Sequence, residues 1–306
     1  MAARLVAVET IPQVRHAHPR GPDGERASWR VERLTVSGIG ISAVLEPGAG
    51  HPIVFLHGNS STKAVWAHQI AAAKQHGRPV LAPDLPGHGD SEDSRHPEAT
   101  YSLPGYAAVI SGLIDRTQWT SVDVVGWSLG GHVGLELFAT DPRIRSLLIV
   151  GTPPGRPSAE AMEQAFHASA DMQLAAKAAF TDSDARAYGT AMMGGPEHLT
   201  EDLLACVKRT DGNARQYLFA SALAGIGSDQ RRAVETLDKP LCVVHGAREP
   251  FVRLEYLCAL GYRALWNNRI HVIGEAGHAP HWECPAEFND ILLNFHEFAA
   301  KCQSAV

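Results

Sequence analysis

The sequence predicts an α/β fold: a mostly parallel, doubly wound sheet with an inserted helical cap. Apolar strand-like segments alternate with amphipathic helical segments over 31–151 and again over 238–306, which is the pattern of a sheet covered by helices on both faces. The later strand segments are near-continuous apolar runs, typical of parallel strands buried on both sides. The stretch 152–237 replaces this alternation with helical sequence, and it therefore predicts the cap.

The composition fits one large globular domain, or a domain with an insertion. The 306 residues are 45% hydrophobic and 20% charged, which argues against disorder and allows a sizeable core. The formal net charge is -6 and no basic block occurs, so the chain lacks the electrostatic footprint of a nucleic-acid-binding protein. No nucleic-acid partner is expected, and the composition leaves the oligomeric state open.

Residues 1–30 are expected to form a loosely ordered leader that precedes the fold. Their longest apolar run is too short for a signal-peptide core or a membrane span, so no membrane association is expected. The five cysteines have irregular spacing and form no C-x-x-C pair, which favours reduced thiols in a reducing compartment. A cytoplasmic location is the corresponding expectation.

The expected strands come first as an alternating pair and then as apolar runs. Segments 31–36 and 39–46 alternate apolar and polar residues, as a half-exposed antiparallel pair would. The apolar strands are expected at 52–57, 79–84, 121–127, 145–150, 240–246 and 269–274. Helical patterns lie at 62–75, 104–116, 129–139, 252–260 and 285–300.

A G-x-S-x-G pattern marks the junction of the predicted strand 121–127 and the helix that follows it. The serine of such a pattern sits on a sharp turn where only glycine fits on either side, and Gly126 and Gly130 provide that clearance. The helix N-terminus also directs its amides at any negative charge that develops there. Ser128 is therefore the candidate nucleophile, although its hydroxyl needs a base to activate it.

A base and an acid follow at the positions that this order of residues requires. His278 lies after the last predicted strand, between glycine and Ala-Pro, in a loop that can present it to the serine. Glu249 is the first carboxylate beyond the strand 240–246, where it can accept the imidazole N–H and stabilise the imidazolium. Asp238 precedes that strand and is poorly placed. His281 is expected to line or support the site without acting as the base.

Two backbone amides are expected to form an oxyanion hole. One belongs to Leu129, which follows the nucleophile, and the other to Asn59 in the segment HGNSS after an early strand. Losing one such donor typically costs about 10² to 10³ in rate. His88, in the segment APDLPGHGDS, precedes the nucleophile on another strand and is expected to be structural.

These segments, in this order, resemble the α/β-hydrolase superfamily over nearly the whole chain after about residue 35. The segments HGNSS, APDLPGHGDS, GWSLGGHVGLE, GTPP, KRTDG, EPFV and HVIGEAGHAP together are most similar to the metal-independent N-acylhomoserine lactonases of the α/β-hydrolase fold. That resemblance implies a glutamate as the triad acid. It places the Ser-His-Glu triad on Ser128, His278 and Glu249, and the oxyanion-loop asparagine on Asn59.

The resemblance also implies substrate-binding residues. A cap tyrosine that can contact the lactone falls on Tyr188, although the cap spacing differs by a couple of residues. Trp127, Gly58 and His281 are expected to join it around the substrate. The chain departs from the family at Arg248, where an acid is expected before the triad glutamate.

No cofactor and no metal ion are expected. The leader does contain His16 and His18, half of an H-x-H-x-D-H metal signature of unrelated lactonases, but Pro19-Arg20 follows instead of the rest of the motif.

The resemblance thus implies an enzyme that opens the ring of N-acylhomoserine lactones, the reaction of quorum quenching. The cap is expected to supply an apolar slot for the acyl chain from Met162, Phe166, Met172, Met192, Met193, Leu218 and Phe219. A carboxylesterase or a carbon–carbon bond hydrolase would share the triad and differ only in the cap lining. A binding protein that kept the fold as a receptor is the third reading, and an intact triad argues against it.

Overall fold

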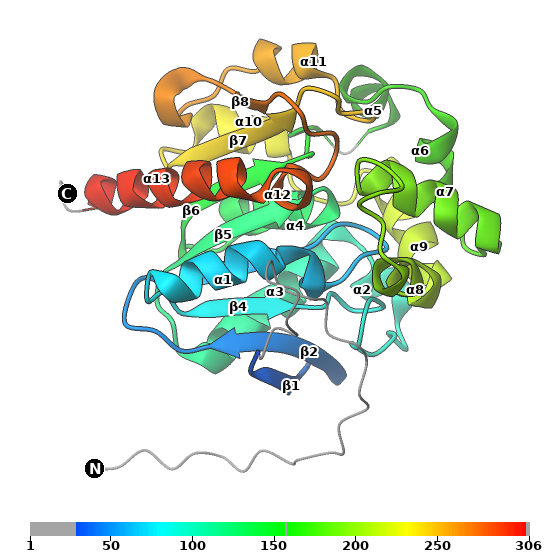
Figure 1. The fold of residues 1–306 in the computed structure, drawn as a ribbon, viewed down its shortest axis with the longest axis horizontal. Helices are drawn as coiled ribbons and strands as arrows, with labels where there is room; N and C mark the ends of the chain where they lie inside the picture. The colour runs from blue at the N-terminus through cyan, green and yellow to red at the C-terminus, as the bar shows by residue number, and fades with distance from the viewer. Residues whose placement is uncertain (1–28, 157, 304–306) are drawn as a thin grey trace.

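A single eight-stranded sheet crosses the molecule in the computed structural model, which describes residues 29–156 and 158–303 (Figure 1). The strands lie in the order β1-β2-β4-β3-β5-β6-β7-β8. Their bounds are β1 (Val31–Val36), β2 (Ile39–Glu46), β3 (Ile53–Leu56), β4 (Val80–Pro83), β5 (Val122–Trp127), β6 (Ile144–Val150), β7 (Leu241–Gly246) and β8 (His271–Ile273). The mostly parallel, doubly wound sheet is confirmed.

The direction of the strands fixes where a site can form. β2 is antiparallel to both β1 and β4, and every other neighbouring pair is parallel. The chain builds outward from β3 to β4 on one side and from β5 onward on the other. The carboxyl ends of β3 and β5 therefore border the point where the winding reverses, which is where ligands bind in sheets of this kind.

Strand β2 is more buried than its alternating sequence predicts. β1 is half-exposed, as expected, but all positions of β2 except Leu45 are buried. Beyond the end of β4 the chain stays alongside β2, because the Asp84 amide donates to the Ser42 carbonyl and the Glu92 amide to that of Gly40. The loop 84–92 therefore covers the small residues at the polar positions of the strand.

Helices cover both faces of the sheet. α1 and α13 pack against each other on the near face of Figure 1, and α3, α4 and α10 lie behind the sheet. The bounds of the helices outside the cap are α1 (Ala67–Gln75), α2 (Pro97–Thr100), α3 (Leu103–Thr117), α4 (Leu129–Thr140), α10 (Gln230–Thr236), α11 (Leu254–Ala259), α12 (Pro280–Glu283) and α13 (Pro285–Gln303), with 3₁₀ turns η1 (Lys63–Trp66) and η2 (Trp266–Asn268).

The helical predictions differ from the structure in two ways. The expected helix 62–75 is divided into η1 and α1. α2 and α12 were not predicted, because each is a single turn that starts at proline and is too short to show a period. The other expected helices match α3, α4, α11 and α13 to within a few residues.

The regular elements of the stretch 152–237 are helices. Its described residues, 152–156 and 158–237, form no strand. Its elements are α5 (Ala159–Ala165), α6 (Ala170–Leu174), α7 (Asp182–Met192), α8 (Glu201–Arg209) and α9 (Gly212–Leu223), followed by α10. Each starts at a residue whose side-chain oxygen accepts a backbone N–H: Ser158, Ser169, Thr181, Thr200, Asp211 and Asp229. α10 packs against α4 of the sheet layer.

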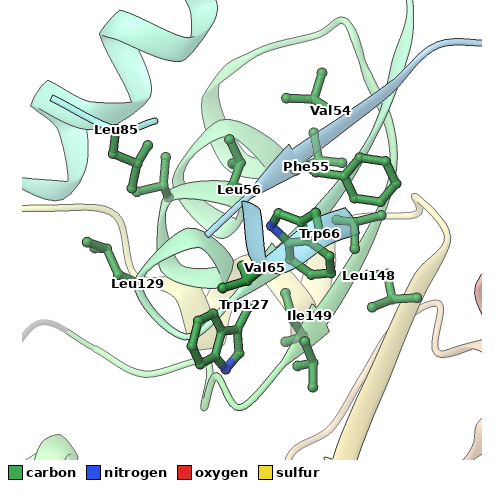
Figure 2. Close-up of a cluster of buried hydrophobic side chains, with 14 of the residues drawn as sticks. Val54, Phe55, Leu56, Val65, Trp66, Leu85, Trp127, Leu129, Leu148 and Ile149 are labelled. Carbon is green, nitrogen blue, oxygen red and sulfur yellow. The ribbon is translucent and has the colours of Figure 1, made fainter. Parts of the chain in front are cut away.

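A buried apolar cluster fixes the central strands where they approach the site (Figure 2). Phe55 of β3 and Trp66 of η1 lie 5.3 Å apart between ring centroids, and both are fully buried. Trp127 at the end of β5 and Leu148 of β6 lie on the same face of the sheet as Phe55 and complete this layer. Because these side chains are close-packed, the residues that follow β3 and β5 have little freedom to move.

One prediction concerns a part of the chain outside this description, and another concerns membrane-spanning helices. Most of the expected leader, with His16 and His18, lies outside the described residues. Within residues 29–156 and 158–303, no helix has the length and apolarity needed to cross a membrane.

Candidate active site

Ser128 occupies a strained turn between β5 and α4. Its backbone has φ 53° and ψ −116°, in the left-handed half of the map that non-glycine residues rarely adopt, and its amide donates to the Val150 carbonyl at 2.9 Å. Such a conformation costs about 1–3 kcal/mol and persists only where the surroundings enforce it. A Cβ on Gly126 would lie 2.4 Å from the Gly130 carbonyl oxygen, and one on Gly130 would lie 2.1 Å from that of Leu56. Both glycines are therefore required by the close approach of backbone.

The loop after β3 is held by a histidine whose role the sequence did not reveal. His57 donates from Nδ1 to the Gly58 carbonyl at 2.8 Å and accepts at Nε2 from the Leu85 amide at 2.9 Å. Burial lowers its pKa to about 4, so the ring is neutral near pH 7. His57 thus ties the loop that carries Asn59 to the exit of β4.

The two amides expected to form the oxyanion hole are free to donate to a ligand. Among the described residues, neither the Asn59 amide nor the Leu129 amide has an acceptor. Asn59, Leu129 and Ser128 line the same cavity. The Asn59 side chain is used elsewhere, since its Nδ2 donates to the Ala175 carbonyl in the cap at 3.1 Å.

His278 and Glu249 form a buried pair from two different loops. Nδ1 of His278 lies 2.8 Å from each carboxylate oxygen of Glu249, and both side chains are almost completely buried. Oε1 of Glu249 also accepts from the Phe251 amide at 2.9 Å. Burial opposes ionisation of this carboxyl, but the His278 ring and the Phe251 amide outweigh it and hold the pKa of Glu249 below its ordinary value.

The outer nitrogen of the histidine is available for proton transfer. Nε2 of His278 is buried and has no hydrogen-bond partner in the part of the chain that the structure describes. His278 and Ser128 both line the cavity. With Nδ1 held by a carboxylate, the neutral ring carries its proton at Nδ1 and presents a lone pair at Nε2, which is the form that a general base needs.

A second carboxylate, Glu283, fixes the loop that carries the histidine. Its two oxygens accept from the amides of Gly277 and Ala279 at 2.7 and 2.8 Å, one on each side of His278. Glu283 was not among the residues predicted from the sequence. Its signal is weak: a carboxylate in the first turn of the short helix that starts at Pro280.

The cavity above Ser128 is mainly apolar. Six of the seven residues expected in the acyl slot line it, namely Met162, Phe166, Met172, Met192, Leu218 and Phe219. Met193 instead lines a smaller neighbouring pocket. Tyr188 lines both pockets, and burial raises the pKa of its phenol.

The other three expected substrate contacts do not line this cavity, although Trp127 lines the smaller neighbouring pocket. Trp127 is fully buried, and its Nε1 donates to the His278 carbonyl at 2.8 Å. Gly58 packs against this indole so closely that a Cβ would lie 2.9 Å from it. His281 is fully buried, with its ring 4.9 Å from that of Trp127, and burial lowers its pKa well below the ordinary value. These residues support the catalytic loop from behind.

His88 is placed as a structural residue. It is fully buried, its Nδ1 lies 3.0 Å from the Pro86 carbonyl, and burial lowers its pKa to about 3. It packs against the His57 ring at 5.3 Å between centroids and does not line the cavity.

Comparisons with known proteins point to one family. The profile described as "Alpha/beta hydrolase family" matches residues 53–291. Among solved structures, a mutant of the N-acyl homoserine lactonase AidH complexed with N-hexanoyl homoserine lactone is similar with a TM-score of 0.85 and 38% identity, covering 89% of this chain and 99% of that one.

Curated relatives carry other activities in their names. The pimeloyl-[acyl-carrier protein] methyl ester esterase of Xanthomonas campestris pv. campestris is 32% identical over 242 residues, covering 76% of this chain and 90% of that protein. The 2-hydroxy-6-oxononadienedioate/2-hydroxy-6-oxononatrienedioate hydrolase of a Pseudomonas species is 25% identical over 268 residues, covering 79% of this chain and 87% of that protein.

The extent of the profile match agrees with the fold and with the serine turn between β5 and α4. This chain belongs to the alpha/beta hydrolase family, and it is a hydrolase.

Proposed function

We propose that the protein opens the lactone ring of N-acylhomoserine lactones by nucleophilic catalysis with Ser128, His278 and Glu249. One observation carries this proposal: His278, whose Nδ1 is paired with the buried Glu249, lines the same cavity as Ser128, and its Nε2 is unpaired among the described residues. The likeness to a lactonase structure at 38% identity over nearly the whole fold supports the lactone as substrate.

Acylation begins with proton transfer from the Ser128 hydroxyl to Nε2 of His278. The serine oxygen attacks the lactone carbonyl carbon, and the negative charge that develops on the carbonyl oxygen is stabilised by the amides of Asn59 and Leu129. The carbon–oxygen bond of the ring then breaks, and the imidazolium returns the proton to the departing homoserine hydroxyl. Glu249 stabilises the imidazolium throughout.

Deacylation repeats these steps with water. His278 takes a proton from the water, whose oxygen attacks the carbonyl carbon of the acyl-enzyme. Collapse of the intermediate breaks the bond to Ser128, and the imidazolium protonates the serine oxygen. The product is N-acylhomoserine and the enzyme is restored.

The apolar cavity accounts for recognition of the acyl chain. Each methylene that is buried contributes about 0.8 kcal/mol, so preference for chain length is expected to be graded. Methionines at the wall adapt to chains of different shape, because their side chains are unbranched and flexible.

A general carboxylesterase is the second candidate. It is favoured by the relative at 32% identity, which is a methyl ester esterase by name. It uses the same triad and requires an alcohol leaving group in place of the ring oxygen.

The deciding experiment is mass spectrometry of N-hexanoyl homoserine lactone incubated with the wild type and with Ser128→Ala. The wild type is expected to add one water to the lactone, and the variant is expected to be slower by at least about 10³-fold. Ring opening by Ser128→Ala at the wild-type rate would overturn the mechanism. A methyl ester of equal acyl length, assayed alongside, would favour the esterase if its kcat/KM exceeded that of the lactone by about 100-fold or more.

A further inference from the structure

One corner of the acyl cavity is polar. His132 of α4 lines the cavity with Ser228 and Gln230, which lie at the start of α10. Most of the remaining wall is apolar, so these polar side chains are suited to fix a polar group of a bound substrate. Which polar group they would bind depends on whether they present donors or acceptors to the cavity.

The contacts of Gln230 fix the tautomer of His132. Nε2 of Gln230 lies 3.2 Å from the His132 backbone carbonyl, and Oε1 lies 2.8 Å from Nδ1 of the His132 ring. A carbonyl oxygen only accepts, so the amide nitrogen must face it and the amide oxygen must face the ring. Nδ1 of His132 therefore carries the proton and donates to Gln230.

The remaining ring nitrogen of His132 is an acceptor. Burial lowers the pKa of His132, which keeps the ring neutral near pH 7 and leaves a lone pair on Nε2. Nε2 forms no hydrogen bond with any residue of 29–156 and 158–303, and unlike the unpaired nitrogens of His281 it is not sealed from solvent.

Ser228 adds a second acceptor. Its hydroxyl donates to Oε1 of Glu136 at 2.8 Å, and its backbone amide donates to Oε2 of the same carboxylate at 2.8 Å. The donor of this hydroxyl is therefore used inside the protein, and only lone pairs of Oγ remain for the cavity. Glu136 and His132 lie one turn apart on α4 and together hold the start of α10 in place.

We propose that His132 and Ser228 form a subsite for a hydroxyl group on the acyl chain, so that the substrates are hydroxyacyl compounds. This inference rests on the proposed function and specifies its acyl group. His132 lies four residues beyond Ser128, about 6 Å along the helix, and helix side chains tilt back toward the N-terminus. Because His132 and Ser128 line the same cavity, we expect a hydroxyl on carbon 3 of an acyl group attached to Ser128 to donate to Nε2, whereas a 3-oxo group would place its lone pairs against those of Nε2.

The test compares p-nitrophenyl 3-hydroxyhexanoate with p-nitrophenyl hexanoate as substrates of the wild type, His132→Leu and His132→Gln. The measured quantity is the ratio of kcat/KM for the hydroxylated ester to that for the plain ester. His132→Leu removes the acceptor, and the ratio is expected to fall roughly tenfold, the effect of one hydrogen bond in a partly enclosed site. His132→Gln restores an acceptor near the position of Nε2 and is expected to recover most of the ratio.

Leu218→Met is the matched control, because it changes an apolar part of the same wall and should leave the ratio unaltered. Equal ratios in the wild type, His132→Leu and His132→Gln would overturn the subsite. Neither ester contains a lactone ring, so the ratio remains measurable even if the protein opens no lactone, and failure of the subsite is distinct from failure of the proposed function.

Discussion

Two buried carboxylates lie at opposite ends of the parallel strands, one beyond a carboxyl end and one near an amino end, and they have very different partners. Glu249 follows β7 and is paired with the imidazole of His278, which lines the cavity. Asp123 lies at the start of β5, the strand that ends at the serine turn, and is fully buried. Both have a pKa below the ordinary value, although burial alone would raise it.

Asp123 is neutralised by groups that stay charged. Its oxygens accept from Arg145 at 2.8 and 2.5 Å, from Arg78 at 2.6 Å and from the Ser146 hydroxyl at 2.6 Å. Nδ1 of His296 lies 3.0 Å away. Guanidinium groups do not lose their protons in proteins, so Asp123 keeps two permanent counter-charges across the working pH range.

Among the described residues, Glu249 forms no ion pair with an arginine or a lysine. In the proposed mechanism its partner His278 gains and loses a proton, and its other hydrogen bonds come from backbone amides. Two guanidinium groups at this position would stabilise the carboxylate without regard to the state of His278. In the proposed mechanism, one sheet therefore uses a buried acid for structure at one end of its strands and a second buried acid for proton transfer at the other.

The largest expected effect comes from Glu249→Gln. The amide keeps the volume of the side chain but no longer stabilises the imidazolium, and it permits the wrong ring tautomer. We expect kcat to fall by about 10⁴-fold, with the urea midpoint little changed, as measured by steady-state kinetics and denaturation. A loss below tenfold would mean that another acid serves His278.

Asp123→Asn should have the opposite pattern, with a large loss of stability and little loss of kcat. Two guanidinium groups would then lie buried without a counter-charge, and we expect a loss of about 3–5 kcal/mol in the free energy of unfolding. The folded variant should retain kcat within about twofold, because Asp123 does not line the cavity. Urea denaturation followed by fluorescence measures the first quantity, and kinetics corrected for the folded fraction measures the second. A large loss of kcat with normal stability would contradict a purely structural role for Asp123.

Substitutions of Glu283 test whether catalysis requires the His278 ring to be held in a fixed position, in addition to its pairing with Glu249. Glu283→Ala removes both acceptors from the amides beside His278, and we expect kcat to fall by roughly 10- to 100-fold through misplacement of the ring. Glu283→Gln keeps one acceptor and should lie between the wild type and the alanine variant. Steady-state kinetics gives the order of the three, and equal kcat in all of them would assign the clamp to stability alone.

The sequence predicted the parts of the site that depend on local pattern. Ser128 was identified by its flanking glycines, and His278 and Glu249 by the strands that they follow. The expected strands agree with the structure to within two residues. Each of these signals lies within a few residues of the side chain that it identifies.

The features that the sequence did not predict depend on distant partners. The Asp123 cluster draws on residues 78, 145 and 296, and the burial of β2 depends on a loop some 50 residues later. His57 and His132 look like ordinary histidines until their tautomers are fixed by Leu85 and Gln230. No local period or motif encodes such contacts, because they arise only when the chain is folded.

The smallest expected effect concerns the pH dependence of stability near Asp123. His51 lies 3.8 Å from Asp123, yet burial, with the two neighbouring arginines, outweighs that carboxylate and lowers its pKa from 6.5 to about 4. Between these two pH values the unfolded chain takes up a proton at His51 and the folded chain does not, so stability falls as the pH falls. His51→Gln should reduce the slope by on the order of 1 kcal/mol per pH unit. Urea denaturation of both proteins across this interval measures the difference, and parallel curves would mean that Asp123 already holds His51 in its charged form.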